Sequence, residues 1–123
     1  MRHYSAVLAF ATLVVSCGGS SSTGNPITTP VIPSTPTAPI VTTSVALQNS
    51  SFSPANIQVA SNAVVTFSNN DAIAHNVTFS NGSIGTTGDY SSGSKTLTMP
   101  AAVGDYPFRC TLHAGMSGTV TVK

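Results

Sequence analysis

The run YPFRCTLHAGMSGTVTV spans residues 106–122 and carries the pattern on which the fold depends. Both of its ends alternate apolar side chains with others, a period of two that is typical of half-buried β-strands. Between these ends, Cys110, His113 and Met116 follow one another at intervals of three residues. Their side chains can meet only if the chain turns back in a tight loop, and Gly115 permits such a bend. A thiolate, an imidazole and a thioether gathered in one loop indicate a metal site.

The rest of the sequence supplies one more histidine for this site. The chain has three histidines, and His3 lies in an N-terminal leader, so His75 and His113 remain. It has two cysteines, and because Cys17 lies at the end of the leader, Cys110 has no disulfide partner within the domain. A cysteine and two histidines in a trigonal plane, with a weak axial methionine, are the ligands of blue copper centres. The sequence therefore predicts one copper ion, cycling between Cu(I) and Cu(II), held by these three side chains and the methionine of the loop.

Each ligand also has a plainer interpretation when it is taken alone. Cys110 could be a buried structural thiol, and Met116 could fill a gap in the core, which is the strongest of these alternatives. His75 and His113 could be ordinary polar residues. Structural zinc prefers four strong ligands, and a thioether is not one of them. Two histidines are too few for a trinuclear copper cluster, and no third member accompanies the Cys–His pair, so we expect an electron carrier and not an enzyme.

Short runs with strand character follow residue 40, and turn residues such as Asn, Gly and Pro separate them. They lie at 41–47, 57–59, 63–67, 75–79, 94–99, 106–110 and 118–122. No run past the leader has the 3.6-residue period of a helix. Seven short strands at this spacing predict an antiparallel β-sandwich. The apolar side chains expected in its core are Val45, Leu47, Phe52, Ile57, Val59, Val65, Phe67, Val77, Phe79, Leu97, Phe108, Val120 and Val122.

The chain is poor in charge. Charged residues make up 6% of it, against about 25% in an average soluble domain. Between residues 41 and 123 the basic and acidic side chains balance, so the net charge of this part is zero. Because there is no basic patch to neutralise phosphates, nucleic acid is not an expected partner.

The N-terminus has the features of a targeting segment. Arg2 gives it a positive start, and residues 6–15 are apolar but too few to span a bilayer. The segment ends in Val14-Val15-Ser16-Cys17, which resembles the bacterial lipobox. That resemblance implies a lipoprotein signal peptide over residues 1–16 and a lipidated Cys17 at the mature N-terminus. A plain secretory signal with an incidental cysteine is the alternative.

Residues 17–40 are rich in Gly, Ser, Thr and Pro, which predicts an extended tether between the lipid anchor and a domain at 41–123. These features predict a membrane-anchored lipoprotein of the bacterial cell envelope that faces the periplasm. By resemblance to lipoproteins of Gram-negative bacteria, Gly18 after the cysteine favours the outer membrane. In a Gram-positive host the same anchor would sit on the outer face of the cell membrane.

The stretch 75–122 resembles the cupredoxin family, in particular the plastocyanin- and amicyanin-like small blue copper proteins. The matching residues are His75-Asn76, the strand 104–110, His113, Met116 and the tail 118–122. The short gaps on both sides of His113 resemble the amicyanin loop. The resemblance implies a Greek-key β-sandwich of about seven to eight strands.

The same resemblance implies roles for residues around the metal. Asn76 would brace the ligand loop through a hydrogen bond. His113 would lie at an exposed apolar end, among Leu112, Ala114 and Ile73, and pass electrons. Since this sequence lacks the acidic patch of plastocyanin, we expect it to dock to its redox partner in a different way from plastocyanin. We expect a monomeric carrier of electrons between periplasmic or membrane redox partners, such as a cytochrome, an oxidase or a reductase. A copper-binding or copper-delivering lipoprotein without a shuttle role is the alternative.

Overall fold

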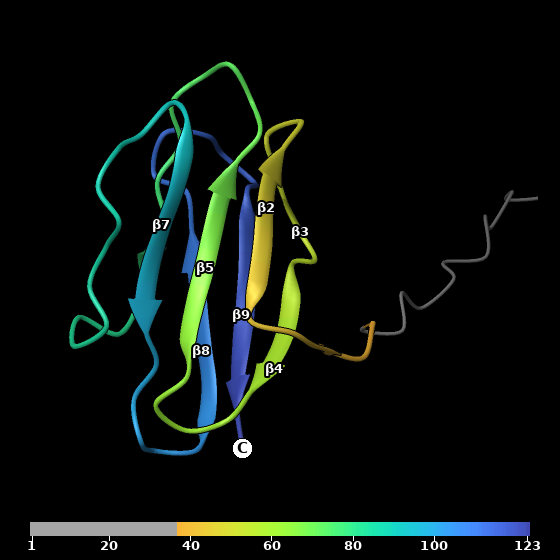
Figure 1. The fold of residues 1–123 in the computed structure, drawn as a ribbon, viewed down its shortest axis with the longest axis vertical. Coiled ribbons are helices and arrows are strands. Elements are labelled where there is room, and N and C mark those ends of the chain that lie inside the picture. Colours follow the sequence, from red (N-terminus) through yellow and green to blue (C-terminus); the bar gives the residue numbers. More distant parts are fainter. Residues whose placement is uncertain (1–36) are drawn as a thin grey trace, which may run out of the picture. The chain divides into compact units, whose positions relative to one another are not determined.

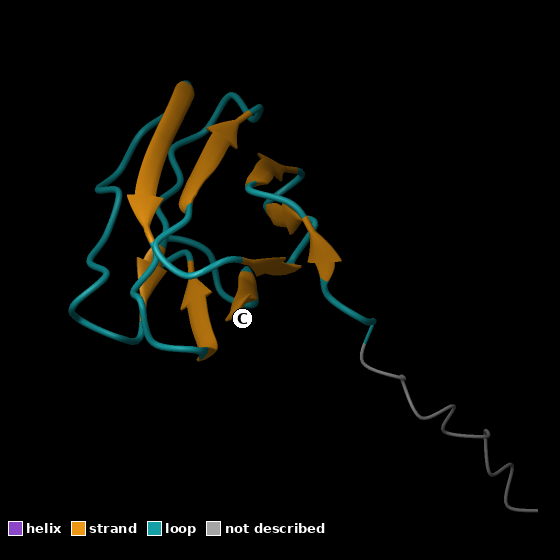
Figure 2. Cartoon of the chain, turned by 60° about the horizontal axis from the view of Figure 1, so that its bottom comes forward, coloured by secondary structure: helices purple, strands orange, loops and turns teal. Residues whose placement is uncertain are grey.

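The computed structural model describes residues 37–123, and within them the chain consists of strands and loops (Figure 2). The strands are β1 (Ile40–Val41), β2 (Ser44–Gln48), β3 (Ser51–Ser53), β4 (Asn56–Val59), β5 (Val64–Asn69), β6 (Thr78–Phe79), β7 (Gly93–Thr98), β8 (Gly104–Arg109) and β9 (Ser117–Val122). The expected signal peptide, Cys17 and the tether up to residue 36 lie outside the described residues. In the described part, no helix is long and apolar enough to cross a membrane.

Two sheets form the predicted β-sandwich, which is confirmed (Figure 1). One sheet has the order β1-β4-β9-β8-β6, and the other has the order β3-β2-β5-β7. Both sheets are mixed and not wholly antiparallel, because β2 pairs with β5, and β4 with β1 and β9, in parallel. The cause is the path of the chain, which crosses between the sheets after most strands. Only β2–β3 and β8–β9 join neighbours in one sheet through a direct turn.

The core lies between the sheets and contains the expected apolar side chains. All of them are buried except Leu97, which is only partly buried. Phe108 is the centre of an aromatic cluster, with ring centroids 4.8 Å from Phe52, 5.6 Å from Phe67 and 5.2 Å from Phe79. Most of these rings meet edge to face, the arrangement that their quadrupoles favour. Phe108 lies two residues before Cys110, so this cluster supports the strand that leads into the metal loop.

The strand β3 was not expected from the sequence. It forms because residues 49 and 50 make a two-residue hairpin turn, with Gln48 paired to Ser51 across it. Asn49 and Ser50 both have a φ of 53°, as a turn of type I′ requires. The backbone N–H groups of Asn49 and Ser50 in this turn donate to the side chain of Asp71.

Gly118 lies inside β9, paired with Phe108. A Cβ atom at this position would lie 2.5 Å from Cζ of Phe108 and closer still to the carbonyl oxygen of Ala55. The glycine therefore permits the close approach of Phe108 and of the chain before β4.

One end of the sandwich gathers three connections. The strands β2, β5 and β8 all finish at this end, the upper end in Figure 1, and β9 begins there. The turn at 49–50, the segment 70–77 that follows β5, and the loop 110–116 are consequently close neighbours. The predicted ligands lie in the second and third of these segments.

Candidate metal centre

The loop between β8 and β9 is short and closed by its own backbone. The last pair of the two strands is Arg109 with Ser117, so the loop comprises residues 110–116. The N–H group of Cys110 donates to the carbonyl of Met116 over 3.0 Å, and the N–H group of Met116 donates to the carbonyl of His113 over 3.4 Å. These bonds give the tight loop that the three-residue spacing predicts.

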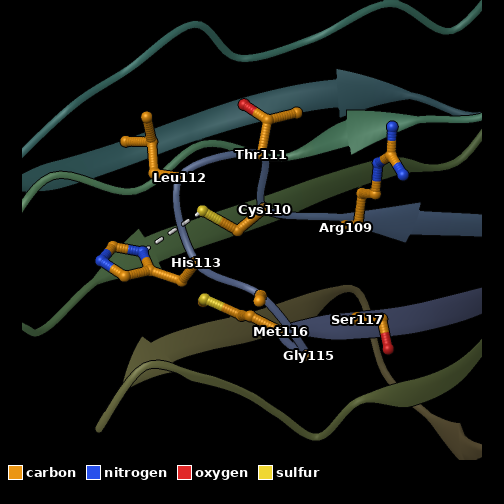
Figure 3. Close-up of a pocket in the computed structure, with 9 residues that line it drawn as sticks. Arg109, Cys110, Thr111, Leu112, His113, Gly115, Met116 and Ser117 are labelled. Carbon is orange, nitrogen blue, oxygen red and sulfur yellow. Dashed lines mark hydrogen bonds between the residues drawn. The ribbon is translucent and has the colours of Figure 1, made fainter.

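The side chains of the loop divide into two groups. Figure 3 shows the side chains of Cys110, His113 and Met116 extending toward the same side of the loop, whereas Arg109 extends upward and Ser117 downward in this view. Residues 109–117 line a pocket of about 630 Å³ here. Gly115, with a φ of 82°, makes the bend before Met116. The loop thus brings a thiol, an imidazole and a thioether to one side.

His75 completes the cluster from the segment before β6. Its Nδ1 atom lies 3.1 Å from Nδ1 of His113 and 3.9 Å from Sγ of Cys110. The Sγ atom of Cys110 lies 3.6 Å from Nδ1 of His113. Both histidines therefore offer the same ring atom, Nδ1, to the space that the thiol faces.

These separations fit one bound metal ion. Around a trigonal centre, a nitrogen at about 2.0 Å and a sulfur at about 2.3 Å from the ion lie about 3.7 Å apart, and two nitrogens lie about 3.5 Å apart. The observed nitrogen–sulfur distances of 3.6 and 3.9 Å match the first value, and the nitrogen–nitrogen distance of 3.1 Å is slightly shorter than the second. A thiolate with two imidazoles and a methionine beside them is the donor set of blue copper and not of structural zinc.

The four side chains differ in exposure. His75 is fully buried, Cys110 is 4% exposed and Met116 is 3% exposed. His113 is only partly buried. A metal ion among them would be shielded from water on most sides, and the ring of His113 would be its connection to the surface.

Two exposed apolar residues, Leu112 and Ala114, flank His113 in the chain. Leu112 is 48% exposed, Ala114 is exposed, and Ile73, which lies in the segment before His75, is 47% exposed. All three residues that the sequence placed around His113 are therefore on the surface of the protein. The charged side chain of Arg109 extends upward in the view of Figure 3, away from the ring of His113.

Asn76, next to the buried histidine, ties its own segment to the ligand loop. Its Oδ1 atom accepts from the N–H group of Thr111 over 2.9 Å, and its Nδ2 atom donates to Oγ1 of Thr111 over 2.7 Å. The same Nδ2 atom donates to Oδ1 of Asp89 over 2.8 Å. Since Thr111 follows Cys110 directly, these bonds fix the distance between the two segments that carry the ligands.

Asp71, which the sequence did not identify as a site residue, contacts the buried ligand His75. Its Oδ2 atom accepts from Nε2 of His75 over 2.8 Å. Hydrogen bonds from the backbone N–H groups of Ser50 and Asn49, and then from His75, hold the pKa of Asp71 below its usual value of 3.8. The signal that could have identified it is a carboxylate four residues before a ligand histidine, because such partners orient metal-bound imidazoles.

Tyr90 connects the site to the core. Its backbone N–H and carbonyl groups pair with those of His75 over 2.9 and 3.0 Å. Its hydroxyl donates to the carbonyl of Phe67 over 3.1 Å. Burial, followed by the negative charge of the Cys110 thiolate, raises the pKa of Tyr90 to about 12.

Comparison with known proteins agrees with this geometry. The family profile described as copper binding proteins of the plastocyanin/azurin family matches residues 40–123. No curated protein sequence matches the chain significantly. Among solved structures, the reduced Cu(I) form of an amicyanin variant at pH 4 has a TM-score of 0.59 and 27% identity, over 65% of this chain and 80% of that one.

A second Cu(I) amicyanin variant has a TM-score of 0.59 and 24% identity, over the same shares of the two chains. A novel purple cupredoxin from Nitrosopumilus maritimus shares the fold with a TM-score of 0.53 and 19% identity, over 65% of this chain and 98% of that one. The copper-binding family and the donor set of the site both fit one copper ion as the cofactor. The chain belongs to the plastocyanin/azurin family of copper-binding proteins, the cupredoxins.

Proposed function

We propose that the protein carries single electrons, with one copper ion held by His75, Cys110, His113 and Met116. The observation that carries this proposal is the convergence of three donor atoms, from two segments far apart in sequence, at separations that suit one ion. The ion, when bound, supplies the change between Cu(I) and Cu(II). The protein supplies the ligands, the shape of the site and the exclusion of water.

Each side chain of the site has its own task. Cys110 would give the thiolate, and the two histidines would bind the ion through Nδ1. Met116 would offer its thioether as a weak further ligand. The loop is closed by backbone bonds, and His75 is held by its backbone pairing with Tyr90 and by the contact of Nε2 with Asp71. The ligands therefore need to move little when the charge of the ion changes. Small rearrangement favours rapid electron transfer.

The partly exposed ring of His113 is the proposed exit for the electron. Leu112, Ala114 and Ile73 make an apolar surface near it. The zero net charge of the domain gives little electrostatic steering, so docking depends on apolar contact. The proposed partners are redox proteins such as a cytochrome, an oxidase or a reductase, which the monomeric carrier meets in turn.

The proposed location rests on the N-terminal sequence. A lipobox-like stretch ending at Cys17 and a Pro-rich tether support a lipoprotein held on a bacterial membrane. We place it in the cell envelope, facing the periplasm, on the outer membrane. Growth of the producing cells with labelled palmitate tests this, because Cys17→Ala should abolish the label. A label retained in Cys17→Ala would contradict the anchor.

The copper site is tested by the visible spectrum after addition of Cu(II). We expect an intense thiolate-to-copper charge-transfer band that Cys110→Ser removes, while the apo variant still unfolds cooperatively. A matched control is Met99→Leu, in which a buried core residue changes and the band stays. A colourless wild-type protein that is folded would overturn the assignment.

Voltammetry then tests the carrier role. We expect a reversible one-electron wave and rapid exchange with a small soluble cytochrome. Copper that leaves readily for a Cu(I) chelator, with no reversible wave, would instead fit a protein that binds and delivers copper.

A further inference from the structure

Asp71 joins two segments of the metal-binding end through one carboxylate, the turn at 49–50 and the segment 70–77. Its Oδ1 atom accepts from the N–H group of Asn49 over 2.7 Å, and its Oδ2 atom accepts from the N–H group of Ser50 over 3.0 Å. The same Oδ2 atom accepts from Nε2 of His75 over 2.8 Å. The carboxylate is thus anchored on a rigid hairpin turn and contacts the far side of a buried ligand ring.

The main chain around His75 is fixed independently of the carboxylate of Asp71. The backbone of His75 pairs with Tyr90 in both directions. The side chain of Asn69 donates to the carbonyls of Ile73 and Tyr90 over 2.9 and 2.8 Å, and it accepts from the N–H group of Asp71 over 2.9 Å. The carboxylate of Asp71 is consequently the group that controls the ring itself, namely its rotation and the atom that carries its proton.

The contact selects one tautomer of His75. A carboxylate can only accept, so the Nε2 atom must carry the proton and the Nδ1 atom is left with its lone pair. That lone pair faces Cys110 and His113. The hydrogen bond between the two Nδ1 atoms then takes its proton from His113, whose ring is the more exposed of the two.

We propose that Asp71 is a positioning residue that holds His75 ready to bind through Nδ1 and lowers the reduction potential of the centre. This inference rests on the proposed copper site. A carboxylate that accepts from a ligand imidazole makes the imidazole a stronger donor, and its negative charge lies one ring away from the donor atom. Both effects stabilise Cu(II) more than Cu(I), so the ion is harder to reduce.

The variant Asp71→Asn removes the charge and keeps the size of the side chain. Loss of such a partner costs about 10-fold to 100-fold in metal affinity. We expect that loss for Cu(II) and a smaller one for Cu(I), measured by competition with chelators. Each tenfold difference between the two losses raises the potential by about 59 mV.

Asp105→Asn is the matched control, because it removes the same charge. Asp105 lies near the start of β8, at the opposite end of that strand from Cys110, and accepts from Thr121. We expect its potential and its affinity for Cu(II) to equal those of the wild type. A potential that rises equally in both variants, or in neither, would overturn the inference.

A measurement on the apo protein tests the tautomer without copper. Nitrogen-15 NMR of the histidine rings should show His75 protonated at Nε2 and bare at Nδ1 in the wild type. In Asp71→Asn we expect faster exchange of the Nε2 proton with water. A wild-type His75 protonated at Nδ1 would overturn the positioning role, and this result decides the matter alone if Asp71→Asn does not fold.

The proposed copper site and the proposed role of Asp71 can be refuted independently of each other. If the wild type gives no charge-transfer band with Cu(II), the copper site itself fails, whatever the variant does. If the wild type gives the band and Asp71→Asn leaves the affinity and the potential unchanged, only the role of Asp71 fails.

Discussion

The Nδ1 atoms of His75 and His113 lie 3.1 Å apart, although the two residues are 38 positions apart in the chain. Both Nδ1 atoms lie near Sγ of Cys110, at 3.9 and 3.6 Å, but the rings differ in exposure, since His75 is fully buried and His113 is partly exposed. The buried ring also donates to a carboxylate, whereas His113 has its contacts only with His75 and Cys110 among the described side chains. His75 is thus part of the protein core, whereas His113 lies between the site and the solvent.

This difference predicts opposite responses to removal of each ring. His113→Gly opens a hole to solvent, so added imidazole should enter it and restore the charge-transfer band with Cu(II). His75→Gly leaves a closed cavity and deprives the Asp71 carboxylate of its imidazole partner, so we expect a less stable protein that imidazole does not rescue. Titration of both variants with imidazole, followed by visible absorption, measures this. Equal rescue of the two variants would contradict the assigned exposures.

The role of Met116 can be separated from its packing. Leucine has a similar volume and no thioether, so Met116→Leu should change the free energy of unfolding by less than about 1.5 kcal/mol. If the thioether is the axial ligand, its loss should raise the reduction potential while the charge-transfer band remains. Met99→Leu is the matched control, because Met99 is buried just after β7, at the other end of the sandwich (Figure 1). An unchanged potential in Met116→Leu would leave Met116 as a core residue only.

Asn76 should matter for both the loop and the metal. Asn76→Ala removes four hydrogen bonds, two of them to Thr111, so we expect the apo protein to lose about 1–3 kcal/mol of stability. The loop would also be held less firmly, and Cu(II) should dissociate faster, by about tenfold or more. Urea unfolding and chelator competition measure the two effects. The control is Asn56→Ala, because no side-chain hydrogen bond of Asn56 is present in residues 37–123; equal effects in both variants would argue against a bracing role.

Much of the fold could be predicted because a strand with one buried face shows a period of two. That pattern located the inward residues, including Phe108, and it implied two layers. It could not show which strands become neighbours, so the parallel pairing of β2 with β5 was missed. The strand β3 has only three residues and one buried side chain, Phe52. A segment of this length is too short for a period of two to be recognised.

The site could be inferred from residue types at fixed spacing, because few side chains bind copper and this chain has few of them. Asp71 was missed because an aspartate after Asn-Asn is also what an ordinary turn contains. Its partners at 49 and 50 belong to a hairpin more than twenty residues away in the chain. The contact depends on the parallel pairing of β2 with β5 in one sheet, which no local sequence pattern predicts.

Tyr90 predicts a loss of stability at high pH. Its pKa in the folded protein is about 12, and an unfolded tyrosine has a pKa of about 10, so the folded state favours the neutral phenol. Stability from this group is therefore complete below pH 10 and is lost as the pH rises toward 12. Burial is the main cause and the Cys110 thiolate is the second, so Cys110→Ser should lower the pKa of Tyr90.

Urea unfolding of the apo protein between pH 9 and 12 measures this loss. At pH 9, Tyr90→Phe should be less stable than the wild type by about 1 kcal/mol, because the hydrogen bond to the carbonyl of Phe67 is gone. The gap between the two proteins should narrow as the pH rises, since only the wild type has a buried phenol to ionise. Absorbance of tyrosinate, taken as the difference between the two proteins, reports the pKa directly. A gap that stays constant up to pH 12 would show that Tyr90 ionises equally well in the folded and unfolded states.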